Sequence, residues 1–119
     1  TENAVNKIKV FQFDSVRELG AVMSHTTLCL LNNSGPRHLA AALGIKNLAI
    51  FEKFDNGQWK VYEDDNNEVI ESGVNCKYCN EGCCRNIILE NSKFGSECLQ
   101  QISVQNVIDK IKDILIKNN

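Results

Sequence analysis

The run from Asn32 to Gly44, NNSGPRHLAAALG, constrains the fold of this chain more than any other segment. The apolar and β-branched residues just before it, Thr27 to Leu31, are typical of a buried strand. Asparagine, serine and glycine then turn the chain, and Pro36 suits the first helical position, where its missing N–H costs nothing. Gly44 follows at the point where a left-handed residue ends a helix. The segment therefore predicts a strand, a turn and a helix N-terminus in succession.

A helix that starts after such a turn offers a place for an anion. Backbone N–H groups of its first turn lack partners and the helix dipole is positive there, which favours phosphate. The His38 imidazole is expected near the mouth of the turn, about one helical turn beyond the asparagine and serine. The candidate ligands of a phosphate or sugar phosphate are therefore Asn33, Ser34, Gly35 and His38. The alternative is purely structural, because every α/β domain needs strand-to-helix turns and these residues commonly form them.

Three further segments have the patterns of strands. These predicted strands cover Ile8–Phe13, Asn47–Phe51 and Glu68–Glu71. The polar, Asn-rich segment Asp55–Asn67 is predicted to be a long loop. Within it, Trp59 and Tyr62 are expected to anchor the core or to pack beside a sugar or base.

Two further helices are predicted from their caps. Ser15 and Glu18 form a capping box ahead of a helix that ends near His25. Ser103 caps the last helix, whose apolar residues repeat at helical spacing. That apolar stripe consists of Val104, Val107, Ile108, Ile111, Ile114 and Leu115.

The helix of the motif is expected to turn Leu39, Ala42 and Leu43 toward the core. Since strands alternate with helices along the chain, the sequence predicts an α/β fold. Its sheet is expected to be Rossmann-like, with parallel strands flanked by helices and joined by right-handed crossovers.

Composition fits one domain that has neither a basic surplus for nucleic acid nor a membrane-spanning helix. With 119 residues, against roughly 100–200 per domain, residues 1–119 are expected to form a single α/β domain. The formal net charge of -2 leaves no basic surplus for nucleic acid. No apolar run approaches the roughly 18 residues of a membrane-spanning helix, and no signal peptide opens the chain. We therefore expect a cytoplasmic location.

Five of the six cysteines gather in the cysteine-rich segment 76–98. A C-x-x-C pair with two further thiolates could hold a structural zinc, and no other cofactor is required. The expected ligands are Cys76, Cys79, Cys83 and Cys98, with Cys84 as an alternative to Cys83. Disulfides, an iron–sulfur centre and reduced structural thiols are the other interpretations. The sixth cysteine, Cys29, is expected to be a buried, inert thiol in a strand.

The motif resembles the donor-site motif of glycosyltransferase family 9, the ADP-heptose:lipopolysaccharide heptosyltransferase family. That family typically has Asn or a similar residue, then Asp, Ser or Thr, Gly, Pro, Met, His, Leu, three Ala, Leu and Gly. Residues 32–44 match nearly every step. Weaker similarity covers residues 14–115 and includes the segments 15–19, 48–51 and 98–102, Trp59, Cys76 and Cys79.

The resemblance implies a GT-B glycosyltransferase, in which two Rossmann-like domains face a cleft and the C-terminal one holds most of the nucleotide sugar. This chain resembles the later part of that C-terminal domain, so the fragment alone is expected to be inactive. In the full-length enzyme, a heptose would pass from an ADP-heptose-like nucleotide diphosphate sugar to the lipopolysaccharide core. The acceptor would be bound through the missing N-terminal domain, at the inner membrane face. Asn33, Ser34 and Gly35 would cradle the diphosphate and sugar, and His38 would bind a phosphate or sugar oxygen.

Two departures from the family pattern bear on this chemistry. Asn33 stands where the family usually has Asp, so it keeps hydrogen-bonding capacity but lacks the charge. After the strand Leu48–Phe51 the family usually continues with Gly, Pro or Ala, and Thr, whereas here Glu52 is followed by lysine and phenylalanine. The Glu52 carboxylate would repel a diphosphate unless it points away or pairs with Lys53 or Arg37. The alternatives are a degenerate relative that serves as a structural or protein-binding module, and a metal-binding module built on the cysteines.

Overall fold

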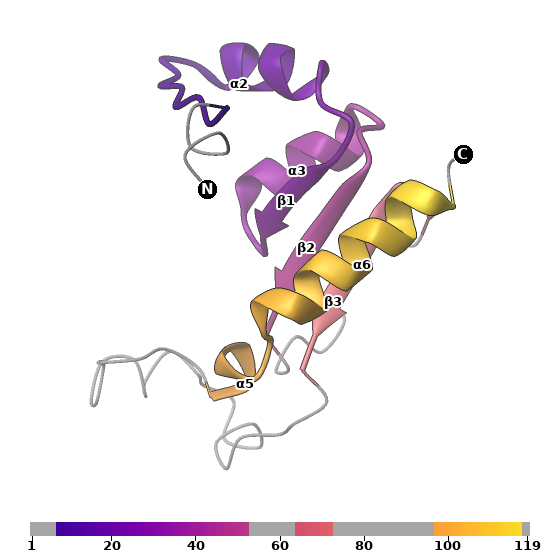
Figure 1. The fold of residues 1–119 in the computed structure, drawn as a ribbon. Helices are drawn as coiled ribbons and strands as arrows, with labels where there is room; N and C mark the ends of the chain where they lie inside the picture. Colours follow the sequence, from indigo (N-terminus) through magenta and orange to yellow (C-terminus); the bar gives the residue numbers. More distant parts are fainter. Residues whose placement is uncertain (1–6, 53–63, 73–96, 118–119) are drawn as a thin grey trace, which may run out of the picture.

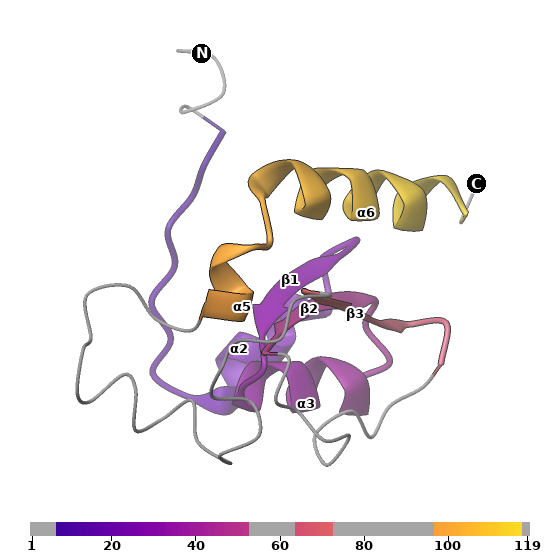
Figure 2. The ribbon, with the colours of Figure 1, turned by 90° about the horizontal axis from the view of Figure 1, so that it is seen from below.

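The computed structural model describes residues 7–52, 64–72 and 97–117. Within these residues, three parallel strands form one sheet in the order β1 (Cys29–Asn32), β2 (Asn47–Phe51) and β3 (Asn67–Glu71). Helices α2 (Val16–Met23) and α3 (Gly35–Ala42) lie on one face of this sheet, and α6 (Val104–Ile116) lies on the other (Figures 1 and 2). A short helix, α5 (Glu97–Gln100), precedes α6. The predicted α/β class, a parallel sheet flanked by helices, is confirmed.

The register of the sheet brings the ends of its strands together. Asn47 pairs with Cys29 on one side and with Asn67 on the other, so the three strands start at the same level. Their carboxyl ends therefore share one edge, which is where parallel α/β sheets usually bind ligands. The predicted strands over Asn47–Phe51 and Glu68–Glu71 are confirmed, and β1 starts at Cys29 rather than at Thr27.

The predicted strand over Ile8–Phe13 is wrong. This segment is neither helical nor part of the sheet, and Ile8 and Val10 are 72% and 90% exposed. Within this segment, the rings of Phe11 and Phe13 stack on each other with their centroids 6.3 Å apart. Alternating apolar residues form a strand only where a neighbouring strand forms hydrogen bonds with their backbone N–H and C=O groups and a core covers one side. No described strand does so for this segment.

The core on the α2 and α3 side centres on buried Met23, Cys29, Ala40 and Ile45. The burial of Cys29 agrees with its predicted role as a packed thiol. The two helices approach closely at Gly20, where an added Cβ would lie 3.3 Å from Leu43 Cδ1. The close approach of α2 to α3 at this point leaves little room for a side chain at position 20.

The predicted inner face of α3 is partly wrong. Leu39 is half-buried, but Ala42 and Leu43 are exposed, and the fully buried residues are Arg37 and Ala40. The Arg37 guanidinium carbon lies 4.7 Å from the centre of the Phe51 ring. A planar cation can stack on an aromatic ring in this way, which offsets part of the cost of removing it from water. The helix is therefore rotated so that positions 37 and 40 meet the sheet.

Gly44 ends α3 as predicted. Its φ is +67°, in the left-handed region that favours glycine. The N–H of Gly44 donates to Ala41 O at 3.0 Å, and the N–H of Ile45 donates to Ala40 O at 2.9 Å. These two bonds form a Schellman motif, which directs the chain into β2.

A buried amide network joins β2 to β3 at the amino edge of the sheet. Asn47 Nδ2 donates to Asn67 Oδ1 at 2.7 Å and to Ile45 O at 3.0 Å. Asn67 Nδ2 in turn donates to Asp64 Oδ1 at 2.6 Å. This bond, with the backbone N–H of Asn66, lowers the pKa of the Asp64 carboxyl. This network could not be predicted from the local sequence, because it depends on the strand register.

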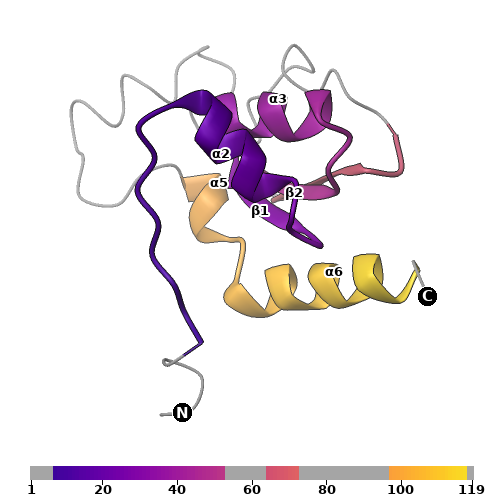
Figure 3. The same ribbon diagram turned by 90° about the horizontal axis from the view of Figure 1, so that it is seen from above.

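Helix α6 lies across the opposite face of the sheet (Figure 3). Lys110 Nζ forms an ion pair with Glu68 Oε2 at 2.9 Å, and Ile114 is 3% exposed. Val107 and Ile111 are half-buried, whereas the other members of the predicted stripe, Val104, Ile108 and Leu115, are exposed. In the described parts of the chain, no helix has both the length and the apolar character needed to cross a membrane.

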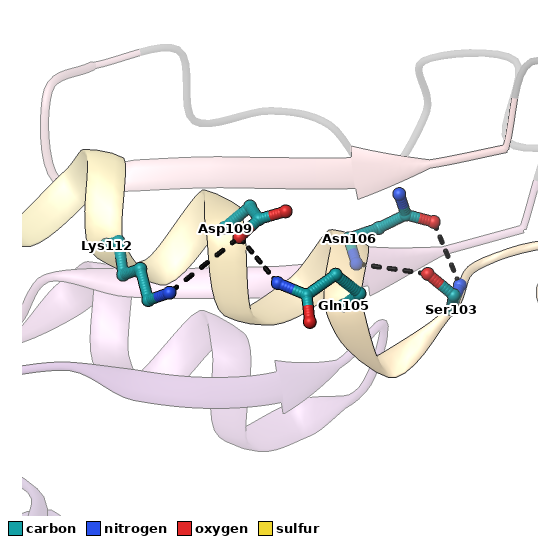
Figure 4. A network of polar contacts seen from close by, with 5 residues as sticks. All are labelled: Ser103, Gln105, Asn106, Asp109 and Lys112. Atoms are coloured by element: carbon teal, nitrogen blue, oxygen red, sulfur yellow. Dashed lines mark hydrogen bonds and ion pairs between the residues drawn. The ribbon is translucent and has the colours of Figure 1, made fainter.

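The start of α6 is fixed by a complete capping box (Figure 4). Ser103 Oγ accepts from the Asn106 N–H at 3.1 Å, and Asn106 Oδ1 accepts from the Ser103 N–H at 3.0 Å. Further along, Asp109 Oδ1 accepts from Gln105 Nε2 at 2.7 Å and lies 4.0 Å from Lys112 Nζ. The predicted cap at Ser103 is confirmed.

Candidate functional site

The candidate site is the turn between β1 and α3, at the carboxyl edge of the sheet (Figure 1). Ser34 is the N-cap of α3 and has an extended backbone, and Gly35 is the first helical residue. Both are exposed, while Asn33 and His38 are half-buried. The four residues predicted to bind a phosphate or sugar phosphate therefore follow one another around this turn and the first turn of α3.

The start of α3 differs from that of the other long helices in its capping. Ser15 Oγ accepts from the Glu18 N–H at the start of α2, at 3.2 Å. Ser34 makes no such side-chain cap, and its hydroxyl instead donates to Asn32 O at 3.4 Å. The exposed Ser34 hydroxyl therefore lies beside a helix start that no serine cap closes.

The amides available to an anion are fewer than predicted. Pro36 has no N–H, and the Arg37 N–H donates to Ser34 O at 3.1 Å. The favourable region is therefore the turn at Ser34 and Gly35 rather than the whole first turn of the helix. There the helix dipole adds to the hydrogen-bonding capacity of the turn.

His38 lies four residues after Ser34, on the same side of the helix as the turn. Its half-exposed side chain is not sealed within apolar packing. An imidazole in this position can donate a hydrogen bond to a phosphate or sugar oxygen at the turn.

The neighbouring strands bring more polar groups to the same edge. Asn32 pairs with Ile50, so the chain after β1 runs level with half-buried Glu52 after β2. Phe51 pairs with Glu71, and buried Ser72 follows β3. The edge thus combines the glycine turn with a carboxylate on the adjacent strand end.

Sequence reasoning missed the buried contact between Arg37 and Phe51 beneath this turn. The available signal was spacing, because Arg37 lies three residues before fully buried Ala40 and so shares its helical face. The contact ties the first turn of α3 to the end of β2. It therefore fixes the relative position of the two chain segments that border the site.

The predicted zinc ligands fall mostly outside the described residues. Cys76, Cys79 and Cys83 lie there, as do Trp59 and Tyr62, whereas Cys98 is fully buried on α5. Within residues 7–52, 64–72 and 97–117, no group of three or more histidine, cysteine or acidic side chains is arranged to hold a metal ion. The zinc site stays a prediction.

A hollow of about 270 Å³ lies at the opposite, amino edge of the sheet. Its lining mixes both signs of charge: Lys46, Asp65, Glu68, Ile114 and Lys117. Lys110 and, more weakly, these two lysines lower the pKa of Glu68. This arrangement is one of mutually compensating charges between β3 and α6, away from the glycine turn.

Comparison with known proteins identifies the chain. The family model described as glycosyltransferase family 9 (heptosyltransferase) matches residues 14–88, which include the whole glycine turn. The chain is also similar to lipooligosaccharide heptosyltransferase 2 of Campylobacter jejuni subsp. jejuni serotype O:2, at 25% identity over 101 residues. That match covers 85% of this chain but only 30% of the relative. No solved structure matches the chain significantly. Because the family model covers more than half of its residues, the chain belongs to glycosyltransferase family 9, the heptosyltransferase family.

Proposed function

We propose that this chain is part of the C-terminal domain of a GT-B heptosyltransferase and binds the nucleotide diphosphate sugar. The donor is of the ADP-heptose type, and its site is the turn formed by Asn33, Ser34 and Gly35 together with His38. The observation that carries the proposal is the start of α3, which no serine side chain caps and which lies at the carboxyl edge of a parallel sheet. The family match spans this turn, which supports the assignment.

The turn acts by stabilising the negative charge of the diphosphate. When the bond between the sugar and the diphosphate breaks, negative charge grows on the departing diphosphate. Donors that are already in place, such as the Ser34 hydroxyl, the Gly35 N–H and the His38 imidazole, stabilise that charge in the transition state. The positive end of the helix dipole acts in the same direction, so this mechanism requires no metal ion.

The acceptor belongs to the full-length protein. We propose that the heptose passes to a lipopolysaccharide core, bound through a domain that is not part of this chain. Transfer then takes place on the cytoplasmic side, at the inner membrane face where such an acceptor is anchored. This chain by itself holds the donor and does not catalyse transfer.

The test is a calorimetric titration of the full-length protein with ADP-heptose, with UDP-glucose as a comparison. Ser34→Ala and His38→Ala are each expected to weaken ADP-heptose binding by roughly 10-fold, because each removes a hydrogen bond to a charged group. Ser103→Ala, at the cap of α6, serves as the control and should leave the affinity unchanged. Unchanged affinity in both site variants would remove the assignment.

Asn33 and Glu52 favour one alternative, a relative that kept the fold and lost transfer. Both residues change the charge of the candidate site from the family pattern. In that case the protein would act as a structural or protein-binding module. A turnover assay of the full-length protein with ADP-heptose and a lipopolysaccharide core acceptor decides between the two, since measurable heptose transfer excludes this alternative.

A further inference from the structure

We propose that β1 is an inner strand of the sheet in the full-length protein. In the described sheet it stands at one end of the order β1, β2, β3. The unit that pairs with its free edge is a strand followed by a helix, from the part of the polypeptide outside these 119 residues. That part is large, because the heptosyltransferase match covers only 30% of the relative. Pairing at this edge does not depend on donor binding by the glycine turn.

The backbone of Leu30 faces the free edge of β1. On the other side of the strand, the Cys29 N–H donates to Lys46 O, just before β2, at 2.9 Å. Backbone groups of successive residues point to opposite sides of a strand, so the N–H and C=O of Leu30 point away from β2. No described strand takes this side of β1, and residues 7–15, which lead into α2, do not join the sheet. Such an edge on an apolar strand is a template for a further strand.

The side chain of Leu30 is uncovered as well. Cys29 and Leu31 face the core that α2 and α3 form, so Leu30 faces the side of the sheet on which α6 lies. There Leu30 is 49% exposed, whereas Leu48, its partner on β2, is fully buried. The cover on this face therefore stops at β2. Parallel sheets are normally covered on both faces, so a further element is expected beside α6, over Leu30.

The handedness of the connections shows how the chain reaches this edge. α2 lies on the same face as α3, the helix that joins β1 to β2 (Figures 1 and 2). Connections between parallel strands are right-handed in nearly all cases. A helix on this face therefore carries the chain in the direction from β1 to β2, and a strand that precedes α2 in the same sheet lies beyond the free edge of β1.

The same rule places the helix of the added unit. A right-handed connection that leads outward, from a strand beside β1 to one further away, has its helix on the α6 face. This is the face on which Leu30 lacks a cover. The added strand is therefore parallel to β1, of similar length to its four residues and apolar on both faces. The added helix presents an apolar side to Leu30.

Residue-resolved amide hydrogen exchange of the full-length protein tests the pairing. The Leu30 N–H is expected to exchange at least roughly 100-fold more slowly than in an unstructured peptide. The Cys29 N–H, which is bonded toward β2, is the internal reference for a protected amide. Unprotected Leu30 beside protected Cys29 would overturn the proposal. Protection of Leu30 that is lost on dilution, together with a halving of the mass measured by light scattering, would assign the edge to a second copy instead.

Cross-linking identifies the occupant. Photo-leucine, incorporated in place of leucine, is expected to link position 30 to residues of the same polypeptide outside this chain. Leu43 packs on Gly20 and should link to α2 in the same sample, which verifies the reaction. Links from position 30 that are confined to residues 1–119, or that join two copies, would overturn the proposal.

A pair of substitutions tests the burial of Leu30 in the full-length protein. Leu30 and Leu43 are equally exposed here, at 49% and 48%. Leu30→Lys is expected to lower the melting temperature by roughly 5 °C or more, since it places a charge beneath the added helix. Leu43→Lys is the control and should lower it by less than about 2 °C. Equally small shifts would contradict the proposal. Hydrogen exchange and cross-linking need no lysine variant, so they decide the matter even if Leu30→Lys fails to fold.

Discussion

At the scale of single residues, Arg37 and Asn47 are fully buried although both are polar. Arg37 stacks its guanidinium on the Phe51 ring, and Asn47 donates hydrogen bonds across β2 and β3. Such groups are tolerated in a core only when neighbours replace the water they lose. Helical spacing places Arg37 on the same face of α3 as Ala40, but the partners of Arg37 and Asn47 could not be predicted from local sequence, because they are set by the packing of α3 on the sheet and by the strand register.

Asn47→Ala is expected to destabilise the protein by about 2–3 kcal/mol, since it removes the donor to Asn67 Oδ1 and leaves space in the core. Urea unfolding measures this change. Exposed Gln105, on α6, provides the control, and Gln105→Ala should cost less than about 0.5 kcal/mol. Equal losses in the two variants would show that the buried network contributes nothing particular.

Acid should weaken the fold through Asp64 and Glu68. Hydrogen bonds from Asn67 and from Lys110 respectively are the largest causes that lower the pKa of these carboxyls. Each therefore stabilises the folded state above its ordinary pKa of about 4, and this contribution is lost as the pH falls through the lowered value. Glu68 is partly exposed, so the share of its ion pair is under about 1 kcal/mol.

Urea unfolding between pH 7 and pH 3 tests this. Glu68→Gln should be less stable than the wild type at pH 7, and the difference should disappear near pH 3. A constant difference over this range would contradict the assignment of the ion pair with Lys110.

At the scale of elements, the predictions from local sequence are correct where a capping residue or an apolar run by itself defines the end of a helix or a strand. Ser103 and Gly44 mark real helix ends, and the apolar run Asn47–Phe51 is a strand. Local pattern failed at Ile8–Phe13, where no described strand pairs with the alternating residues. It also misjudged the inner face of α3, because the docking of that helix on Phe51 rather than its own periodicity sets the rotation.

Gly35 at the start of α3 and Gly44 just after its end should respond differently to substitution by alanine. Gly44→Ala is expected to cost about 1–2 kcal/mol, because its φ of +67° disfavours a Cβ. At Gly35 an added Cβ meets nothing within 4 Å, and its φ is not in the left-handed region. Gly35→Ala should therefore leave stability within about 0.5 kcal/mol of the wild type. Equal melting temperatures for the two variants would show that Gly44 does not need its left-handed backbone.

Alanine substitutions of the serines at the starts of α3 and α6 should distinguish a role in folding stability from a role in donor binding. Ser103→Ala is expected to cost about 1 kcal/mol, since it removes a side-chain cap. Ser34→Ala removes no cap and should cost less than about 0.5 kcal/mol. Chemical denaturation measures both. A larger loss at Ser34 than at Ser103 would mean that the serine of the turn acts in folding rather than in donor binding.

At the scale of the whole molecule, the chain spans 30% of the length of its heptosyltransferase relative. The glycine turn could be found from sequence because strand, turn, proline and histidine follow one another in one short run. The contact of Arg37 with Phe51 beneath that turn could not, because it depends on how α3 packs against β2. The donor site proposed here therefore combines a local motif with a contribution that only the sheet provides.

The cysteine-rich segment gives a further prediction for the full-length protein. If Cys76, Cys79, Cys83 and Cys98 hold zinc, protein purified under reducing conditions should contain about one zinc per chain. Elemental analysis measures this content, and Cys76→Ser/Cys79→Ser should lose the metal. Far less than one equivalent of zinc and of iron in the wild type would exclude a metal centre.

The central claim is that the donor binds at the start of α3. Its most direct test follows the imidazole resonances of the full-length protein, labelled at histidine, during a titration with ADP-heptose. His25 is an exposed histidine beyond the end of α2 and provides an internal reference. The proposed site predicts saturable shifts of the His38 resonances at the affinity found by calorimetry, with those of His25 unchanged. Saturable ADP-heptose binding that leaves His38 unmoved would contradict it.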